Sequence, residues 1–210
     1  METLTRPILE WHVESQPFGH EARSGDRGNV HIDEYRAFAF VVDALGHGND
    51  AAHMADLAES HLTAVQLDVR LESIIENCHR NFRGTRGAAI CLAYLDARTN
   101  MLGWLSVGNI QAVRIRLDSH GMPQFESLIM RGGVVGDRLP ELHASRLLLE
   151  PGDTVVMASD GIGYGWYGEY QPNISAASLA KALLQRHNQH TDDALVLAFR
   201  YFGLNGAALP

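Results

Sequence analysis

The sequence predicts an α+β fold in which helices cover the faces of a pair of largely antiparallel β-sheets. Short strand-like runs between residues 88 and 160 are separated by turn residues and not by helices, which favours antiparallel strands over parallel crossovers. Three further stretches carry apolar residues at helical spacing. Such amphipathic helices need a sheet to cover, so the two observations together indicate one layered domain.

Composition limits the function. The chain has 210 residues, 46% of them hydrophobic, which is enough for a single domain over residues 1–210. A formal charge of −8 without any basic run argues against nucleic acid and against a membrane surface as partner. The start lacks a signal peptide, and no apolar run approaches the ~18 residues of a membrane span. Two cysteines within apolar patterns offer no disulfide framework, so we expect a cytoplasmic location.

The first predicted elements are a hairpin and two helices. Residues 29–42 read as two strands joined by a polar turn. After DALGHG, Asn49 or Asp50 can cap a helix whose small apolar residues continue to Val65. The second helix has one apolar stripe, formed by Leu67, Leu71, Ile74, Ile75, Cys78 and Phe82.

The remaining elements are strands, with one more helix near the end. Strands are predicted in AAICLAYLD, MLGWLSVGN, IQAVRIRLD, FESLIM and DTVVMASD, which span residues 88–96, 101–109, 110–118, 125–130 and 153–160. Residues 175–187 form a third helix with Ser175 as its cap, and ALVLAFRYF forms the last strand.

Several acidic residues stand at the ends of these strands. Asp26 precedes the first hairpin strand and Asp43 follows the second, so hairpin geometry brings them to one rim. Asp160 and the pair Asp192–Asp193 flank two later strands and share a rim if those strands are antiparallel neighbours. Glycines beside these positions allow close approach of backbone and ions.

Carboxylates held close together need a counterion, and an all-oxygen set favours Mg²⁺ or Mn²⁺ over zinc. Two ions would fit the charge. The alternative is that these aspartates are ordinary turn residues of an unrelated sandwich, which is the commoner role for any single one of them.

Three segments, VVDALGHG, VVMASDGI and TDDALVLAFR, resemble signature segments of the PP2C-type serine/threonine phosphatases. The bacterial branch that includes SpoIIE, RsbU and RsbX is the most similar, and RGAAICLAYLD, LSVGNIQAVRIR, MRGGVVG and EPGDTVVMASDG resemble its consecutive strands. The likeness covers roughly residues 11–201 and, without a sensor or receiver segment, is greatest to the stand-alone RsbX type, which resets stressosomes. It implies an αββα four-layer sandwich with two Mn²⁺ or Mg²⁺ ions in a cleft at one edge.

The resemblance also implies a set of metal ligands. Asp43 matches the carboxylate that bridges both ions, and Asp160 and Asp192 match the remaining ligands of one ion. Ala44 stands where the family usually has a glycine whose carbonyl reaches a metal. Alanine keeps that carbonyl, but a positive φ at this position would strain it and loosen the site.

Four further residues are assigned roles near the metals by the same resemblance. Asp26 matches an early acidic position that orients a metal-bound water, and Asp193 takes a supporting position beside Asp192. His47 could donate a proton to the departing seryl oxygen, although it comes one residue later than in the family's DGHGG pattern. Gly161 follows Asp160 in the SDG segment.

The implied activity is metal-dependent hydrolysis of phosphoserine or phosphothreonine in a protein, with a STAS-type scaffold or antagonist of a bacterial stress pathway as substrate. A cysteine nucleophile is not expected, because Cys78 and Cys91 lie in a helix stripe and a strand. The alternative is a phosphatase-like binding or regulatory module with weak or no catalysis. It is prompted by Ala44 and by the lack of a clear phosphate-gripping arginine, since Arg23 and Arg27 match no pattern.

An aromatic loop follows Asp160 in the sequence GIGYGWYGEY. Its residues Tyr164, Trp166 and Tyr167 either contact a partner protein or simply pack the loop, because aromatic side chains serve both purposes.

Overall fold

The computed structural model describes residues 7–66, 70–172 and 174–204. Its strands form two five-stranded sheets in which every pairing is antiparallel. The first sheet contains, in spatial order, β1 (Leu9–Gln16), β10 (Ala194–Tyr201), β9 (Thr154–Ala158), β6 (Gln111–Leu117) and β7 (Pro123–Ser127). The second contains β2 (Asp26–Ile32), β3 (Arg36–Ala44), β4 (Ala88–Asp96), β5 (Met101–Val107) and β8 (Ser145–Leu148).

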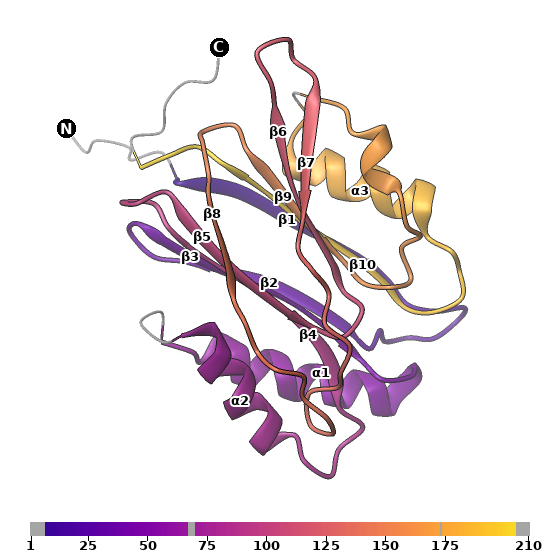
Figure 1. Ribbon diagram of the computed structural model, residues 1–210. Coiled ribbons are helices and arrows are strands. Elements are labelled where there is room, and N and C mark those ends of the chain that lie inside the picture. The colour runs from indigo at the N-terminus through magenta and orange to yellow at the C-terminus, as the bar shows by residue number, and fades with distance from the viewer. Residues whose placement is uncertain (1–6, 67–69, 173, 205–210) are drawn as a thin grey trace, which may run out of the picture.

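Helices cover the outer face of each sheet (Figure 1). The second sheet is covered by α1 (Gly48–Thr63) and α2 (Leu71–Asn81), and the first by α3 (Ala176–His187) together with the short 3₁₀ helix η1 (Trp166–Glu169). The inner faces of the two sheets pack against each other. The order of layers is therefore α–β–β–α, which confirms the predicted fold class.

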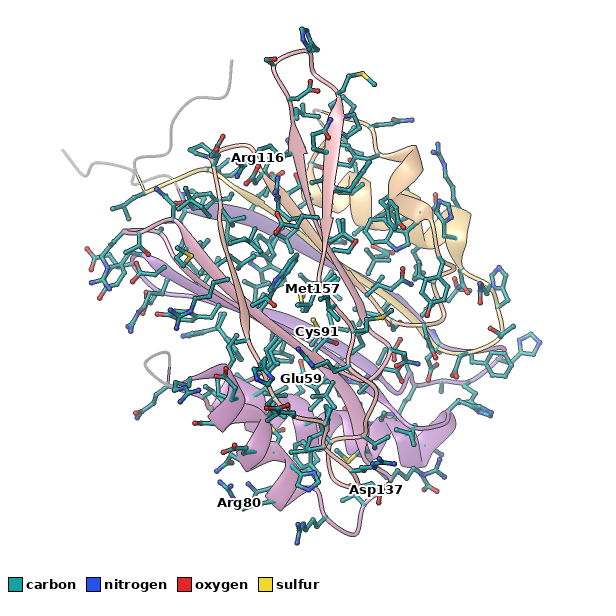
Figure 2. The ribbon with its side chains drawn as sticks, viewed as in Figure 1. Glu59, Arg80, Cys91, Arg116, Asp137 and Met157 are labelled. Carbon is teal, nitrogen blue, oxygen red and sulfur yellow. The ribbon has the colours of Figure 1, made fainter. Side chains whose placement is uncertain are left out.

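Strand β4 has a nearly continuous apolar sequence because both of its faces are buried. Cys91 and Leu95 face the other sheet, whereas Ile90 and Leu92 face α1 and α2, so the strand is buried on both sides. Cys91 and, on the facing sheet, Met157 lie in the layer between the sheets (Figure 2). A framework buried in this way fixes where its strand ends lie.

The predicted hairpin, the third helix and the inner strands are present, but the strands β1 and β8 were missed. Both lie at an edge of their sheet, where only one side is paired and half or more of the residues reach solvent. An edge strand of this kind lacks the apolar run that marks an inner strand. The strand predicted at residues 125–130 lies too far along the chain, because β7 runs from Pro123 to Ser127.

Of the two predicted helix caps, one is confirmed and one is wrong. Ser175 caps α3 as predicted, because its side chain accepts a hydrogen bond from Ser178 N at 3.1 Å. The cap predicted for α1 is wrong: the helix already begins at Gly48, with His47 as N-cap, so Asn49 and Asp50 lie inside its first turn. The predicted start of α2 at Leu67 lies outside the described residues.

Candidate metal centre

The hairpin brings its two acidic residues together. Asp26 is the first residue of β2 and Asp43 the last but one of β3, and the two are direct partners across the antiparallel pair. Asp26 is buried, and Asp43 is partly exposed. This placement follows from local pairing alone, as the sequence indicates.

A serine joins this rim to the end of the other sheet. Asp160 lies just past the end of β9, and Asp192 and Asp193 lie just before β10, its antiparallel neighbour. Between them, Ser159 Oγ donates to Asp26 Oδ2 at 2.7 Å and accepts from a main-chain N–H of β10. The strand ends of both sheets therefore meet at one edge of the molecule, a point that the sequence left open. We call this edge, with Asp26, Asp43, Asp160, Asp192 and Asp193, the acidic rim.

The carboxylate of Asp193 is occupied by the main chain. Its Oδ1 accepts from Phe18 N at 2.8 Å and its Oδ2 from Gly25 N at 2.7 Å. Gly161 lies so close that an added Cβ would stand 2.1 Å from the Asp193 carbonyl oxygen, so this position requires glycine. Asp193 thus holds the loops of the rim in place.

Burial and like charge act together on the rim. Desolvation, and then the neighbouring carboxylates, raise the pKa of Asp43 to about 9. Desolvation likewise raises the pKa of Asp26 to about 8, although the hydrogen bond from Ser159 opposes the shift. Asp160 also has a raised pKa, from desolvation and from the charge of Asp192. Full ionisation of these carboxylates is therefore unfavourable without a cation, and the metal-free rim keeps protons on some of them.

The aspartates share an electrostatic environment without forming a closed cage. Across residues 7–66, 70–172 and 174–204, no three acidic, histidine or cysteine side chains converge as ligands of one ion. The donor set is nevertheless of the right kind, since it consists of carboxylate oxygen atoms, which a cation would favour in their ionised form. Short aspartate side chains can reorient about two χ angles, so the residues fit a hard divalent cation chemically.

Ala44 does not carry the strain that a positive φ would impose. Among the described residues, only Asn100 and His190 combine a positive φ with a side chain. Ala44 ends β3 with its N–H donating to Gly25 O at 3.1 Å and its side chain buried towards the helices. The condition under which Ala44 would loosen the site, a positive φ, is therefore not met.

His47 is held from two sides at the start of α1. Its Nδ1 lies 2.6 Å from Glu21 Oε1, and its ring packs on Phe18 with centroids 5.1 Å apart. The side chain is about half exposed, at 51%. The loop between β3 and α1 thus ends at His47, whose ring is held by Glu21 and Phe18.

Sequence reasoning missed Asn109, Ser159 and Glu21. Asn109 Nδ2 donates to Asp160 Oδ2 at 2.6 Å from the turn after β5. A signal existed for two of them: Asn109 follows Gly108, whose φ is +104°, at a strand end, and Ser159 directly precedes Asp160. Nothing in the local pattern around Glu21 marks it.

Arg23 and Arg27 are engaged elsewhere. Arg27 donates through Nε and an Nη atom to Asp56 Oδ1, at 3.0 and 2.6 Å, and Arg23 pairs with the same carboxylate. Asp56 lies on α1, so Arg27 fastens that helix to the start of β2 and Arg23 fastens it to the loop before β2. This arrangement accounts for both arginines without a role in catalysis.

Two of the three aromatic side chains in the loop after Asp160 pack within the protein. Trp166 is fully buried, and Tyr167 packs on it and on Phe125, with ring centroids 5.5 and 5.4 Å away. Tyr164, in contrast, is 72% exposed.

Comparison with known proteins identifies the family of this chain. The sequence profile described as "Stage II sporulation protein E (SpoIIE)" matches residues 33–163, more than half of the chain. The chain belongs to the SpoIIE family. It is accordingly a PP2C-like protein phosphatase, and the alternative of turn aspartates in an unrelated sandwich is wrong.

Individual relatives agree with this assignment. Phosphoserine phosphatase RsbX of Bacillus subtilis (strain 168) is 28% identical over 143 residues, which cover 66% of this chain and 67% of that protein. A chain solved in a study of the bacterial stressosome is also 28% identical, with a TM-score of 0.80 over 91% of this chain and 99% of that one. A structure of RsbX in complex with magnesium has a TM-score of 0.81 at 17% identity, covering 92% and 95% of the two chains, and shares the fold.

Proposed function

We propose that this chain is a metal-dependent phosphatase that hydrolyses phosphoserine or phosphothreonine in a protein of a bacterial stress-signalling pathway. Family membership and the 28% identity to phosphoserine phosphatase RsbX support the activity. One observation carries the mechanism. Strand ends from both sheets bring aspartates to one rim, where burial raises the pKa of Asp43 to about 9.

The metal ligands in this proposal are the carboxylates of Asp43, Asp160 and Asp192 and the carbonyl of Ala44. A hard cation, Mn²⁺ or Mg²⁺, suits these oxygen donors, and two ions would balance the charge of the rim. Bound there, such ions would neutralise the phosphoryl oxygens and make a water molecule acidic enough to attack phosphorus at neutral pH. The relative RsbX has been solved in complex with magnesium, which supports the class of metal.

The chain's own residues have distinct tasks in this reaction. Asp26, whose Oδ2 accepts from Ser159, orients the attacking water. Asn109 holds the Asp160 carboxylate through its side-chain amide. His47 supplies a proton to the seryl oxygen when the bond from that oxygen to phosphorus breaks. No covalent enzyme intermediate is needed, because the attacking group is water.

The substrate we propose is a phosphorylated STAS-type scaffold or antagonist protein. The likeness, at 28% identity, to a chain solved in a study of the bacterial stressosome supports this class of partner. The exposed Tyr164, four residues after Asp160, is positioned in sequence to contact it. A formal charge of −8 argues against nucleic acid and anionic membrane as partners, and none of the described helices is long and apolar enough to cross a bilayer. We place the reaction in the cytoplasm.

Two measurements test the activity. Purified protein should hydrolyse a phosphoserine peptide and para-nitrophenyl phosphate with Mn²⁺, and stop when a chelator is added. Robust turnover in the chelator would refute the mechanism.

Calorimetric titration with Mn²⁺ distinguishes the second candidate, a phosphatase-like binding module, because that candidate binds no metal at millimolar concentration. Asp43→Asn serves as the matched variant, with turnover lost and the fold retained.

A further inference from the structure

Residues 18–25 form an arch that is pinned at both ends to one buried carboxylate. Asp193 accepts from Phe18 N through Oδ1 and from Gly25 N through Oδ2, at 2.8 and 2.7 Å. Within the arch, Glu21 N donates to Phe18 O at 3.1 Å. The arch is therefore fixed relative to the start of β10, which belongs to the acidic rim.

The arch presents two side chains to His47. Glu21 Oε1 lies 2.6 Å from His47 Nδ1, and the Phe18 ring lies against the imidazole at a tilt of 54°. The other oxygen of Glu21, Oε2, is buried and has no hydrogen-bond partner within the part of the chain that the structure describes. It lies against Gly48, where an added Cβ would stand 3.1 Å away. Burying a carboxylate oxygen without a partner costs stability, so stability alone does not explain this placement.

The contact with Glu21 selects one form of the imidazole. An ionised carboxylate can only accept hydrogen bonds, so His47 Nδ1 must carry a hydrogen. The nitrogen left for other partners is Nε2, to which no described residue is hydrogen-bonded, on a side chain that is half exposed. His47 lies four residues after Asp43, at the end of the loop that follows β3.

We infer that Glu21 and Phe18 are positioning residues that hold His47 with Nε2 towards the substrate, as proton donor to the leaving seryl oxygen. This inference rests on the proposed phosphatase function. In the step, the electron pair of the breaking phosphorus–oxygen bond stays on the seryl oxygen, which takes the proton from Nε2. His47 begins with a proton on each nitrogen and ends neutral, with its proton on Nδ1 facing Glu21.

The competing explanation is that Glu21 and His47 form an ordinary exposed ion pair, which contributes little to any property. The chain offers such a pair for comparison. His12 and Glu14 lie 3.0 Å apart, two residues from each other on β1. Glu14→Ala is thus a matched control, since it removes the carboxylate from a histidine that lies outside the arch.

The leaving group of the substrate separates the two explanations. A seryl alkoxide needs a proton to depart, whereas nitrophenolate leaves without one. We expect Glu21→Ala to lower kcat for a phosphoserine peptide about 10- to 100-fold, because positioned proton transfer contributes roughly 10²–10⁴-fold. KM for the peptide and kcat for para-nitrophenyl phosphate should stay within about 2-fold of wild type. His47→Ala should show the same split, and adding Glu21→Ala to it should cause no further loss.

Each outcome decides the matter. An equal loss with both substrates would show that Glu21 supports the fold or the metals and would overturn the inference, as would an unchanged rate with the peptide or an equal effect of Glu14→Ala. Nitrogen-15 NMR of labelled histidine gives a readout besides activity. Neutral wild-type His47 should carry its proton on Nδ1 and lose that preference in Glu21→Ala. A proton on Nε2 in neutral wild-type His47 would overturn the inference, whereas wild-type protein inactive on both substrates with Mn²⁺ would overturn the proposed function.

Discussion

Replacing Asp43 by asparagine should stabilise the metal-free protein while removing its activity. Burial and the neighbouring carboxylates raise the pKa of Asp43 from 3.8 to about 9, so at pH 7 the folded chain keeps a proton that the unfolded chain has lost. The mismatch spans roughly three pH units at about 1.4 kcal/mol each, which sets an upper limit of about 4 kcal/mol. Because neighbouring carboxylates share this cost, we expect Asp43→Asn to raise the free energy of unfolding by about 2–3 kcal/mol.

Urea denaturation followed by circular dichroism, in EDTA at pH 5 and pH 8, measures this effect. The folded state binds the extra proton, so wild-type stability should fall as the pH rises from 3.8 towards about 9, and Asp43→Asn should flatten this slope. Mn²⁺ at about 1,000 times its Kd should reverse the order, because at that excess a ligand stabilises the folded state by about 4.1 kcal/mol and the variant lacks a ligand group. A variant less stable than wild type in EDTA at pH 8 would refute the reasoning.

Asp153 provides a control in which the same substitution should act in the opposite direction. Its buried carboxylate accepts from Arg116 Nε at 2.8 Å and from an Arg116 Nη atom at 2.6 Å, and also from Glu150 N at 2.9 Å. Asp153→Asn breaks a fully paired buried charge and should cost about 2–4 kcal/mol. Equal effects at both positions would mean that the environment of the carboxylate is not what decides.

Three further outcomes follow from the structure. Burial raises the pKa of Cys78 and Cys91 to about 12, so at pH 8 the folded protein should react with a thiol reagent at least about 100-fold more slowly than the urea-unfolded chain, and rapid labelling would contradict their burial. Gly161→Ala should lower the free energy of unfolding by about 2–3 kcal/mol, because its Cβ would stand 2.1 Å from a main-chain oxygen, whereas Gly168→Ala, with nothing within 4 Å, should change it little. Asn109→Ala removes the amide that holds the carboxylate beyond β9 and should weaken Mn²⁺ binding about 10-fold by calorimetry, and an unchanged affinity would exclude this role.

The sequence predicted best those features that depend on residues close together along the chain. The Asp26–Asp43 pair follows from a hairpin whose two strands are joined by a short turn, and Ser175 caps a helix that begins one residue later. The inner strands were visible because burial on both faces imposes a continuous apolar run. The edge strands β1 and β8 were not, because exposure on one side removes that constraint.

Only the tertiary structure decided how the rim is assembled. Ser159 reaches Asp26 across 133 positions of the chain, and Glu21 reaches His47 across 26. Such contacts depend on how two sheets stack and where their strands end, which no local pattern encodes. The tertiary structure also decided the backbone angles of Ala44, whose φ is not positive, so the strain that a positive φ would cause is absent. The residue types and their places at strand ends thus predicted a metal site. The stacking of the two sheets determined which of these side chains lie close together.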